Sequence, residues 1–378
     1  MSPNRSSTQS DLMNMKIKSG GFLSNLAVLM TSTVVALLLG EIGLRLMGWS
    51  PLYVSPERIQ FWKYDALLGW AHQPGQEGIF ETPQFQTFVR INQKGLRDRE
   101  HSYGRLNNIK RILVLGDSFA WGYGVEESKR FSQLLEKSLG VETINAGVSG
   151  YSTDQELLWF RNEGIKYDPD LVILVFSGND IGHNQQQLVY TIYYKPQFVK
   201  EEGQLILKGY PAPRTSPQGR FIYFISQHSA FANLSIQTYF NLLSLYGKLK
   251  DNSAKASSSI DKISHPTRNS FEVTIALFDE MRNIAKSKDA QFLIVATDRW
   301  WNNPSGETYQ DFIDTVKAGG FLVLDVESMP GFDSEEMLIP DDSHWSKAGH
   351  EFVAEKIKDS IEKHRLLSQP KNQGIIAE

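Results

Sequence analysis

The chain contains no cysteine among its 378 residues. This absence excludes a disulfide scaffold, a thiol nucleophile and a metal site built on thiolates. Its eight histidines are scattered, without the spacing of a metal cage. The sequence also has no internal repeat and no glycine-rich phosphate loop. We therefore expect a protein that uses no metal ion and no organic cofactor.

The chain also lacks a strong excess of charge of either sign. Lysine and arginine number 39 against 43 aspartate and glutamate residues, which gives a net charge of −4. No basic block is present that would attract a phosphate backbone, so nucleic-acid binding is not expected. With 41% apolar residues, the chain is long enough for one sizeable domain with additions.

One long uncharged run lies near the N-terminus. Residues 19–40 are 22 uncharged residues, and as a helix they would reach about 33 Å, enough to cross a hydrocarbon core of about 30 Å. Arg5, Lys16 and Lys18 precede the run, which favours a cytoplasmic N-terminus and an extracytoplasmic remainder. The alternatives are a cleavable signal peptide, although no small-x-small cleavage site follows, and a buried helix of a soluble protein.

Short apolar segments alternate with helical patterns through most of the remaining chain. This rhythm predicts an α/β fold with a doubly wound, mostly parallel five-stranded sheet between two helix layers. The expected strands are Ile112–Leu115, Thr143–Ile144, Asp170–Phe176, Phe292–Ala296 and Phe321–Val326. The expected helices are Glu126–Leu139, Thr153–Gly164, Phe271–Lys286, Tyr309–Ala318 and one that begins near Ser346.

Two regions depart from this rhythm. The stretch from Trp49 to about Asn108 contains proline, glycine and aromatic residues without a helical period. We expect a β-rich collar that packs on the domain, with a substrate site as the alternative and Arg97 as the residue to test. A long insertion follows the third strand, with tyrosines, prolines and a helix-like run over Ala230–Leu249. It could be a lid that binds substrate or an interaction surface, and its aromatic residues are expected to form a small core of their own rather than a sugar platform.

These patterns define the expected domain organisation. It consists of a cytoplasmic tail (1–18), a transmembrane helix (19–40), an extracytoplasmic collar (41–108), a catalytic domain (109–367, with the insertion at about 181–266) and a C-terminal tail (368–378).

Ser118 is the first candidate for catalysis. It lies in a tight Gly-Asp-Ser turn directly after the first expected strand. Open α/β sheets place their chemistry at the carboxyl ends of their strands, so a serine at this point is a candidate nucleophile. Glycine, aspartate and serine are also common turn residues, and a serine hydroxyl needs a base and an orienting acid to become reactive.

Candidates for the base and the acid lie near the C-terminus. His344 could remove the proton of a serine, and Asp341, three residues earlier, could fold back onto its imidazole. Asp342 competes with Asp341 for this role. The simpler interpretation is that both aspartates cap the last helix and that His344 is a surface residue.

Further candidate residues of the site follow the second, third and fourth strands. Gly150 could offer its backbone N–H and Asn179 its side-chain amide to an oxyanion, although both are also typical of turns. His183 lies near Asn179 in sequence, and a loop position facing solvent is expected for it. Trp300 and Trp301 could form a rim that stacks on carbohydrate, or one could pack inward and the other stay half exposed.

Four sequence blocks together resemble the SGNH (GDSL) hydrolase family. They are Gly116–Phe119, Val148–Tyr151, Gly178–Asp180 and Asp341–His344. The resemblance implies a three-layer, flavodoxin-like αβα fold, with Ser118 as nucleophile, His344 as base and Asp341 as its orienter. It also implies an oxyanion hole formed by the amides of Ser118 and Gly150 and the side chain of Asn179. Trp345 stands where many members carry proline.

We therefore expect a membrane-anchored, extracytoplasmic serine esterase. Its substrate would be an acyl ester, either an O-acyl group on an envelope glycan, with O-acetyl as the favoured case, or a lipid-like ester. An O-acyltransferase would use the same residues, and a non-catalytic envelope assembly protein is the alternative outside enzymes. Protein partners are not predicted.

Overall fold

The computed structural model describes residues 8–51, 55–105, 109–190, 192–239, 242, 269–301 and 307–368. The chain divides into two compact units. One comprises Met1–Val54 with Ser216–Lys262, and the other comprises Ser55–Thr215 with Ile263–Glu378. Each unit is described by itself.

The larger unit is built on a five-stranded parallel sheet. Its strands are β5 (Arg111–Gly116), β6 (Glu142–Asn145), β7 (Leu171–Ser177), β12 (Gln291–Thr297) and β13 (Val323–Asp325), in the order β13-β12-β7-β5-β6. Every residue of β5 and β7 is buried, as expected for valine-, isoleucine- and leucine-rich strands covered on both faces. The predicted doubly wound α/β fold is confirmed.

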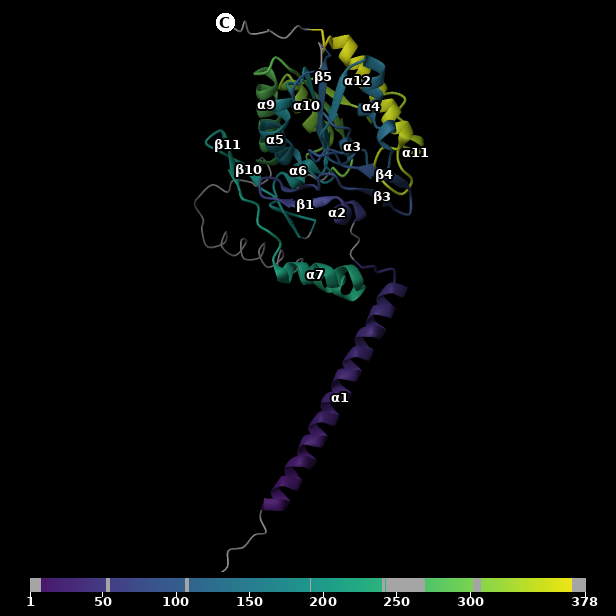
Figure 1. Ribbon diagram of the computed structural model, residues 1–378, viewed down its shortest axis with the longest axis vertical. Helices are drawn as coiled ribbons and strands as arrows, with labels where there is room; N and C mark the ends of the chain where they lie inside the picture. The colour runs from purple at the N-terminus through teal and green to yellow at the C-terminus, as the bar shows by residue number, and fades with distance from the viewer. Residues whose placement is uncertain are drawn as a thin grey trace, which may run out of the picture. The chain divides into compact units, whose positions relative to one another are not determined.

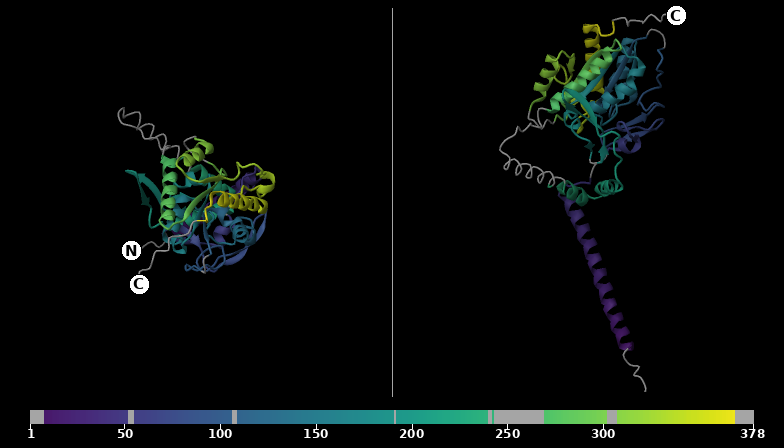
Figure 2. Two further views of the ribbon diagram at one scale, coloured as in Figure 1. Left: turned by 90° about the horizontal axis from the view of Figure 1, so that it is seen from above. Right: turned by 90° about the vertical axis from the view of Figure 1, so that its left-hand side faces the viewer.

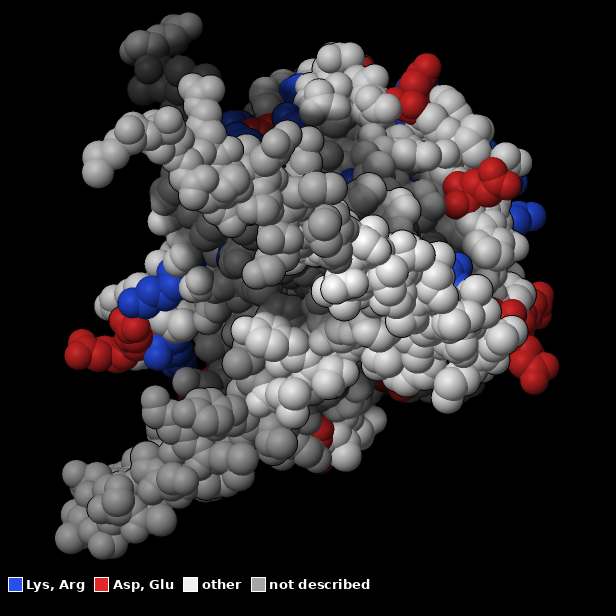
Figure 3. All heavy atoms as spheres, turned by 90° about the horizontal axis from the view of Figure 1, so that it is seen from below, with Lys and Arg blue, Asp and Glu red and all other residues white. Residues whose placement is uncertain are grey.

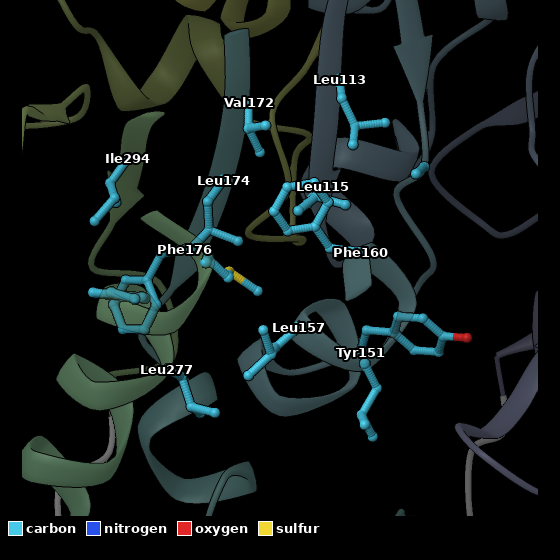
Figure 4. Close-up of a cluster of buried hydrophobic side chains, with 14 of the residues drawn as sticks. Leu113, Leu115, Tyr151, Leu157, Phe160, Val172, Leu174, Phe176, Leu277 and Ile294 are labelled. Carbon is cyan, nitrogen blue, oxygen red and sulfur yellow. The ribbon is translucent and has the colours of Figure 1, made fainter. Parts of the chain in front are cut away.

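Helices cover both faces of this sheet. In Figures 1 and 2, α5 (Thr153–Asn162), α9 (Asn269–Lys286) and α10 (Tyr309–Ala318) lie on one face, and α4 (Phe131–Leu139) and α12 (Lys347–His364) lie on the other. Figure 4 shows the core on the first face, where Leu113 and Leu174 from the sheet meet Leu157 of α5 and Leu277 of α9.

The predicted helix over 126–139 is divided in the structure. Glu127–Lys129 forms a short 3-10 helix, η1, and α4 begins only after Arg130, whose backbone is extended. The Arg130 guanidinium is fully buried and donates to the backbone oxygen of Arg97. The extended backbone at Arg130, beside this buried contact, interrupts the helix at a point that periodicity alone does not reveal.

The segment between Ser55 and Ile91 forms two small antiparallel hairpins after a short helix. The elements are α2 (Pro56–Gln60), β1 (Trp62–Asp65), β2 (Gly69–His72), β3 (Glu77–Glu81) and β4 (Gln86–Arg90). Phe61, Phe80 and Val89 form a core cluster with Trp121 and Tyr123 of the catalytic domain. This part of the chain therefore packs directly beside the loop that carries Ser118.

Arg97 is a structural residue of this collar. Its side chain is fully buried and donates to the backbone oxygens of Trp121 (3.1 Å), Gly122 (2.6 Å) and Val125 (2.7 Å). The cation thereby fixes the turn that follows α3 (Ser118–Trp121). Burial, and the nearby charge of Arg130, hold the pKa of Arg97 well below its ordinary value.

We expect Arg97→Met to lower the free energy of unfolding by about 3 kcal/mol or more, because three buried carbonyl groups lose a charged donor. Urea denaturation measures the change. The matched control is Arg90→Met on the exposed end of β4, for which a change within about 0.5 kcal/mol is expected. Equal effects of the two substitutions would contradict the structural role of Arg97.

The insertion after β7 is divided between the two units. Its first part contains α6 (Asp180–His183), β8 (Leu188–Val189), β9 (Tyr193–Tyr194), β10 (Gln197–Glu201) and β11 (Gln204–Lys208) and belongs to the larger unit. Tyr193 contacts Trp62 edge-on, with ring centroids 5.0 Å apart, and Tyr190 lies 6.3 Å from Trp70. The expectation of a separate aromatic core is therefore wrong, because these rings pack against the collar.

The smaller unit contains a long N-terminal helix, α1 (Thr8–Leu46), together with α7 (Pro217–His228) and a second helical stretch over 230–239. Within α1, Phe22–Leu46 contains an 18-residue window with a mean hydropathy of 2.1 and, by length and composition, is apolar enough to cross a membrane. The predicted helix over Ala230–Leu249 is present as far as 239, and most of its remainder lies outside the described residues. So does the polar stretch expected over Asp251–Ser264.

Candidate active site

Ser118 lies directly after β5, at the first residue of the short helix α3. Gly116 makes the turn possible: a Cβ there would lie 2.7 Å from Ala120 Cβ and 2.9 Å from Val175 Cβ. The Asp117 carboxylate caps the helix by accepting a hydrogen bond of 3.0 Å from the Phe119 amide. Ser118 itself is 7% exposed, so its hydroxyl is held at the edge of the sheet with limited access to water.

The structure brings His344 to Ser118 across 226 positions of sequence. Nε2 of His344 lies 2.7 Å from Ser118 Oγ. On the other side of the ring, Nδ1 lies 2.6 Å from Asp342 Oδ1. The carboxylate accepts a hydrogen bond from Nδ1–H, which leaves Nε2 as the acceptor that faces the serine hydroxyl.

The acid at this position is Asp342 and not Asp341, so the sequence-based preference is corrected. Asp342 Oδ1 also accepts a hydrogen bond of 2.9 Å from the backbone amide of His344, which closes a tight turn over two residues. Asp341 is exposed, and its backbone adopts a left-handed φ of 57°. Burial alone would raise the pKa of Asp342, but the hydrogen bonds from the His344 ring and backbone hold it below its ordinary value.

Aromatic side chains hold the imidazole of His344 in place. Tyr123 stacks on it with ring centroids 4.0 Å apart, and Trp300 contacts it edge-on at 4.8 Å. Trp345, at the position where many relatives carry proline, is fully buried against Phe119 and donates from Nε1 to Glu327 Oε1 (2.9 Å). These contacts restrict the ring to the orientation that reaches Ser118.

The two adjacent tryptophans have different positions. Trp300 is 42% exposed beside His344, as expected of a rim residue. Trp301 instead packs inward against Phe312 and Tyr309, and its Nε1 donates to the backbone oxygen of Glu307 (3.2 Å). Of the two expected arrangements, the structure therefore shows the second, in which one tryptophan packs inward and the other stays half exposed.

Gly150 and Asn179 follow the neighbouring strands, as predicted. Gly150 has φ +79°, and a Cβ there would lie 3.0 Å from Tyr190 Cε2 and 3.1 Å from Trp62 Cη2. Asn179 Oδ1 accepts a hydrogen bond from the Ser177 hydroxyl, which fixes the amide so that its NH₂ group faces away from Ser177. His183, expected to face solvent, is instead half-buried beside Tyr190, and burial lowers its pKa to about 4.

Ser177 links Asn179 to the Ser118 turn. Its hydroxyl also lies 2.7 Å from Asp117 Oδ2, although one hydroxyl hydrogen serves only one acceptor. Burial raises the pKa of Asp117, and the hydrogen bonds that its carboxylate accepts from the Ser177 hydroxyl and the Phe119 amide oppose this shift.

Sequence reasoning missed several residues of this site. Tyr123, five positions after Ser118 in the same loop, could have been noticed from that proximity. Ser177 ends β7 directly before the Gly-Asn pair. Glu57 is different: it is buried in the collar and lies within 3.3 Å of the Ser149 hydroxyl, and nothing in the sequence links it to the site.

Among the residues that the structure describes, no group of three or more histidine, aspartate or glutamate side chains is arranged to hold a metal ion. In the view of Figure 3, charged side chains of both signs occur in small separate groups without a continuous field of one sign.

Two solved structures illustrate the similarity of this chain to known proteins. A putative lipolytic protein of the G-D-S-L family from Desulfitobacterium hafniense DCB-2 is similar over 68% of this chain and 99% of its own, with 14% identity and a TM-score of 0.39. The lipase/acylhydrolase from Enterococcus faecalis is similar over 68% of this chain and 97% of its own, with 16% identity and a TM-score of 0.34. No curated protein sequence matches the chain.

The sequence model of the GDSL-like lipase/acylhydrolase family matches residues 114–352, which is more than half of the chain and contains the blocks around Ser118, Gly150, Asn179 and His344. The chain therefore belongs to the GDSL-like lipase/acylhydrolase family, the ester-hydrolysing SGNH hydrolases.

Proposed function

We propose that the protein is a serine esterase in which Ser118, His344 and Asp342 act as a catalytic triad. The observation that carries the proposal is the continuous hydrogen-bonded line from Asp342 through His344 to Ser118, with distances of 2.6 and 2.7 Å. Distances of this size are those at which an imidazole can take a hydroxyl proton.

In this mechanism Ser118 Oγ attacks the ester carbonyl while His344 Nε2 takes its proton. Asp342 holds the Nδ1–H tautomer and stabilises the imidazolium that forms. The tetrahedral oxyanion would be bound by the amides of Ser118 and Gly150 and by the NH₂ group of Asn179. His344 then returns the proton to the leaving alcohol, and water releases the acyl group by the same steps in reverse order.

The proposed substrate is an O-acyl ester, with an acetyl group on an envelope glycan as the favoured case. The half-exposed Trp300 beside His344 supports a sugar-bearing substrate, because indole rings stack on carbohydrate. An O-acyltransferase would deliver the same acyl group to a sugar hydroxyl. Incubation with an acetylated glycan and an acceptor sugar tests this point: free acetate as the main product supports hydrolysis, and acetylated acceptor supports transfer.

We further propose that α1 is retained as a membrane anchor, with the catalytic domain outside the cytoplasm. Glu41 near the end of the candidate span accepts hydrogen bonds from the amides of Ala230 (2.9 Å) and Phe231 (3.0 Å), and Arg45 donates to the backbone oxygen of His228 (3.2 Å). A carboxylate at the start of a helix stabilises that helix. Removal of α1 as a signal peptide would break these contacts, which supports its retention.

The absence of cysteine allows a direct test of this topology. We expect a membrane-impermeant maleimide to label Lys363→Cys on α12, but to label Ser7→Cys only after the membrane is opened. The intact mass of the membrane-extracted protein should include residues 1–46. A mature protein that starts after residue 46, or equal labelling of both positions in sealed cells, would contradict the anchored topology.

A further inference from the structure

The short helix α2 of the collar lies beside both halves of the proposed active site. Ser149 Oγ, next to Gly150, donates to Glu57 Oε1 (3.3 Å). Ser55 Oγ, at the start of α2, lies 3.2 Å from the hydroxyl of Tyr123, the residue that stacks on His344. Residues 55–62 therefore form a wall next to the position that an ester bound at Ser118 would occupy.

The guanidinium of Arg58, a residue of this wall, packs against two aromatic rings. Its guanidinium carbon lies 3.7 Å from the centroid of Tyr190 and 5.3 Å from that of Trp62. These are the same two rings that approach Gly150 most closely, since a Cβ at Gly150 would lie 3.0 and 3.1 Å from them. The ring of Tyr190 thus lies between Arg58 and Gly150, whose amide is a proposed oxyanion donor.

Two donors of this group lack acceptors. Arg58 Nε and Trp62 Nε1 are buried, and neither has a hydrogen-bond partner among the described residues. Glu57 Oε1 lies 3.8 Å from Arg58 Nε, which is too far for an N–H···O bond, and its carboxylate already accepts from the hydroxyls of Ser55 and Ser149. Unpaired buried donors are costly, and the described residues leave these two without an acceptor.

Arg58 forms a long ion pair with Glu57, whose Oε1 lies 3.8 Å from Arg58 Nε, and burial raises the pKa of Glu57. Lys195, in the same part of the insertion, is fully buried and paired with Asp154. His183 lies 5.3 Å from Tyr190, and its lowered pKa keeps this ring neutral at physiological pH. Arg58 therefore provides the positive charge of this group, and its planar guanidinium can donate two parallel hydrogen bonds to a carboxylate.

We propose that Arg58, held on Tyr190 and Trp62 beside Gly150, binds a carboxylate of the substrate, so that the preferred substrate is an acyl ester of an acidic saccharide. This inference rests on the proposed esterase function of Ser118. The aromatic rings next to Arg58 add the flat apolar surface on which a sugar ring can lie.

A matched pair of small esters tests the proposal with the full-length protein. The probes are a methyl O-acetyl-glucopyranosiduronate and the corresponding methyl O-acetyl-glucopyranoside, which differ only in the carboxylate. The wild-type enzyme should favour the uronate in kcat/KM. Arg58→Gln should reduce the uronate-to-glucoside ratio roughly 10- to 100-fold, mainly through KM, because a charge-assisted pair is lost. Arg58→Lys should give an intermediate ratio.

The control is Arg282→Gln on α9, since Arg282 also lies over an aromatic ring (3.8 Å from Phe321) but pairs with Asp279. This variant should keep the wild-type ratio. If Arg58→Gln is unstable, inhibition of the wild type by methyl glucuronoside should exceed that by methyl glucoside, and high salt should reduce the difference. An unchanged ratio in Arg58→Gln, or equal inhibition by the two glycosides, would overturn the proposal. Turnover that survives Ser118→Ala would instead refute the esterase mechanism.

Discussion

Ser118→Ala is expected to reduce kcat for a small acetyl ester by at least about a thousandfold, because the attacking oxygen and the acyl-enzyme route are both lost. The hydroxyl of Ser118 contacts His344, and its removal leaves the packing of β5 and α3 unchanged. The melting temperature should therefore change little while turnover nearly disappears. Initial rates with p-nitrophenyl acetate measure the effect.

The matched control is Ser138→Ala on α4. The Ser138 hydroxyl contacts the backbone oxygen of Leu135 in its own helix (3.4 Å) and lies away from the site. This variant should retain wild-type rates within about twofold, as substitutions outside a site usually do. Ser118→Ala with full turnover would show that the ester bond is broken by another route.

Asp342→Asn should lower kcat by about 10²- to 10⁴-fold, because it removes the acceptor that fixes the tautomer of His344. An asparagine NH₂ group in this position would donate to Nδ1. The ring proton would then reside on Nε2, which faces Ser118 Oγ at 2.7 Å and could no longer accept its proton. The effect should appear equally in kcat and in kcat/KM, since substrate contacts are unchanged.

Asp341→Asn is the control next to it in sequence. Asp341 is exposed, and the His344 ring is bound by Asp342, so this change should leave kcat within about threefold. The lowered pKa of Asp342 means that its carboxylate is ionised throughout the neutral range. The stabilisation that it gives the fold is complete above its unfolded pKa and is lost only as the pH falls through its lower folded pKa. A larger effect from Asp341→Asn than from Asp342→Asn would contradict the observed geometry.

The sequence predicted the parallel sheet and the pairing of Ser118 with His344, and for physical reasons. Buried parallel strands such as 171–177 are continuous apolar runs, and their carboxyl ends must meet at one edge. Ser118, Gly150 and Asn179 could be identified as candidate site residues because each lies in the loop that follows such a strand. His344 could be identified because its block precedes a strongly periodic helix.

The errors came from local backbone geometry and from contacts between distant segments. Spacing alone could not decide between Asp341 and Asp342, because the choice depends on a turn in which one carboxylate accepts from both the ring and the amide of His344. Adjacency alone could not decide whether Trp300 and Trp301 both form a rim or only one does, because consecutive side chains in a loop point in different directions. The place of Arg58 beside Gly150 depends on Tyr190 and Trp62, which come from different parts of the chain.

The collar acquires a second role from this arrangement. Arg97 stabilises the turn after α3 by donating hydrogen bonds to three of its backbone oxygens. Ser55, Glu57 and Arg58 instead face Tyr123, Ser149 and Tyr190, which lie next to His344 and Gly150. The same segment thus stabilises the loop after α3 and, in the proposed function, forms a wall of the substrate site, so composition alone could not separate the two roles.

The most direct test of the central claim is to locate the adduct of a serine-reactive alkyl phosphonate by peptide mass spectrometry. The account predicts a single covalent modification on Ser118, formed in parallel with loss of esterase activity, and strongly slowed in Asp342→Asn. Complete inhibition with the phosphonate on another residue, or ester hydrolysis by a protein whose Ser118 is never modified, would contradict it.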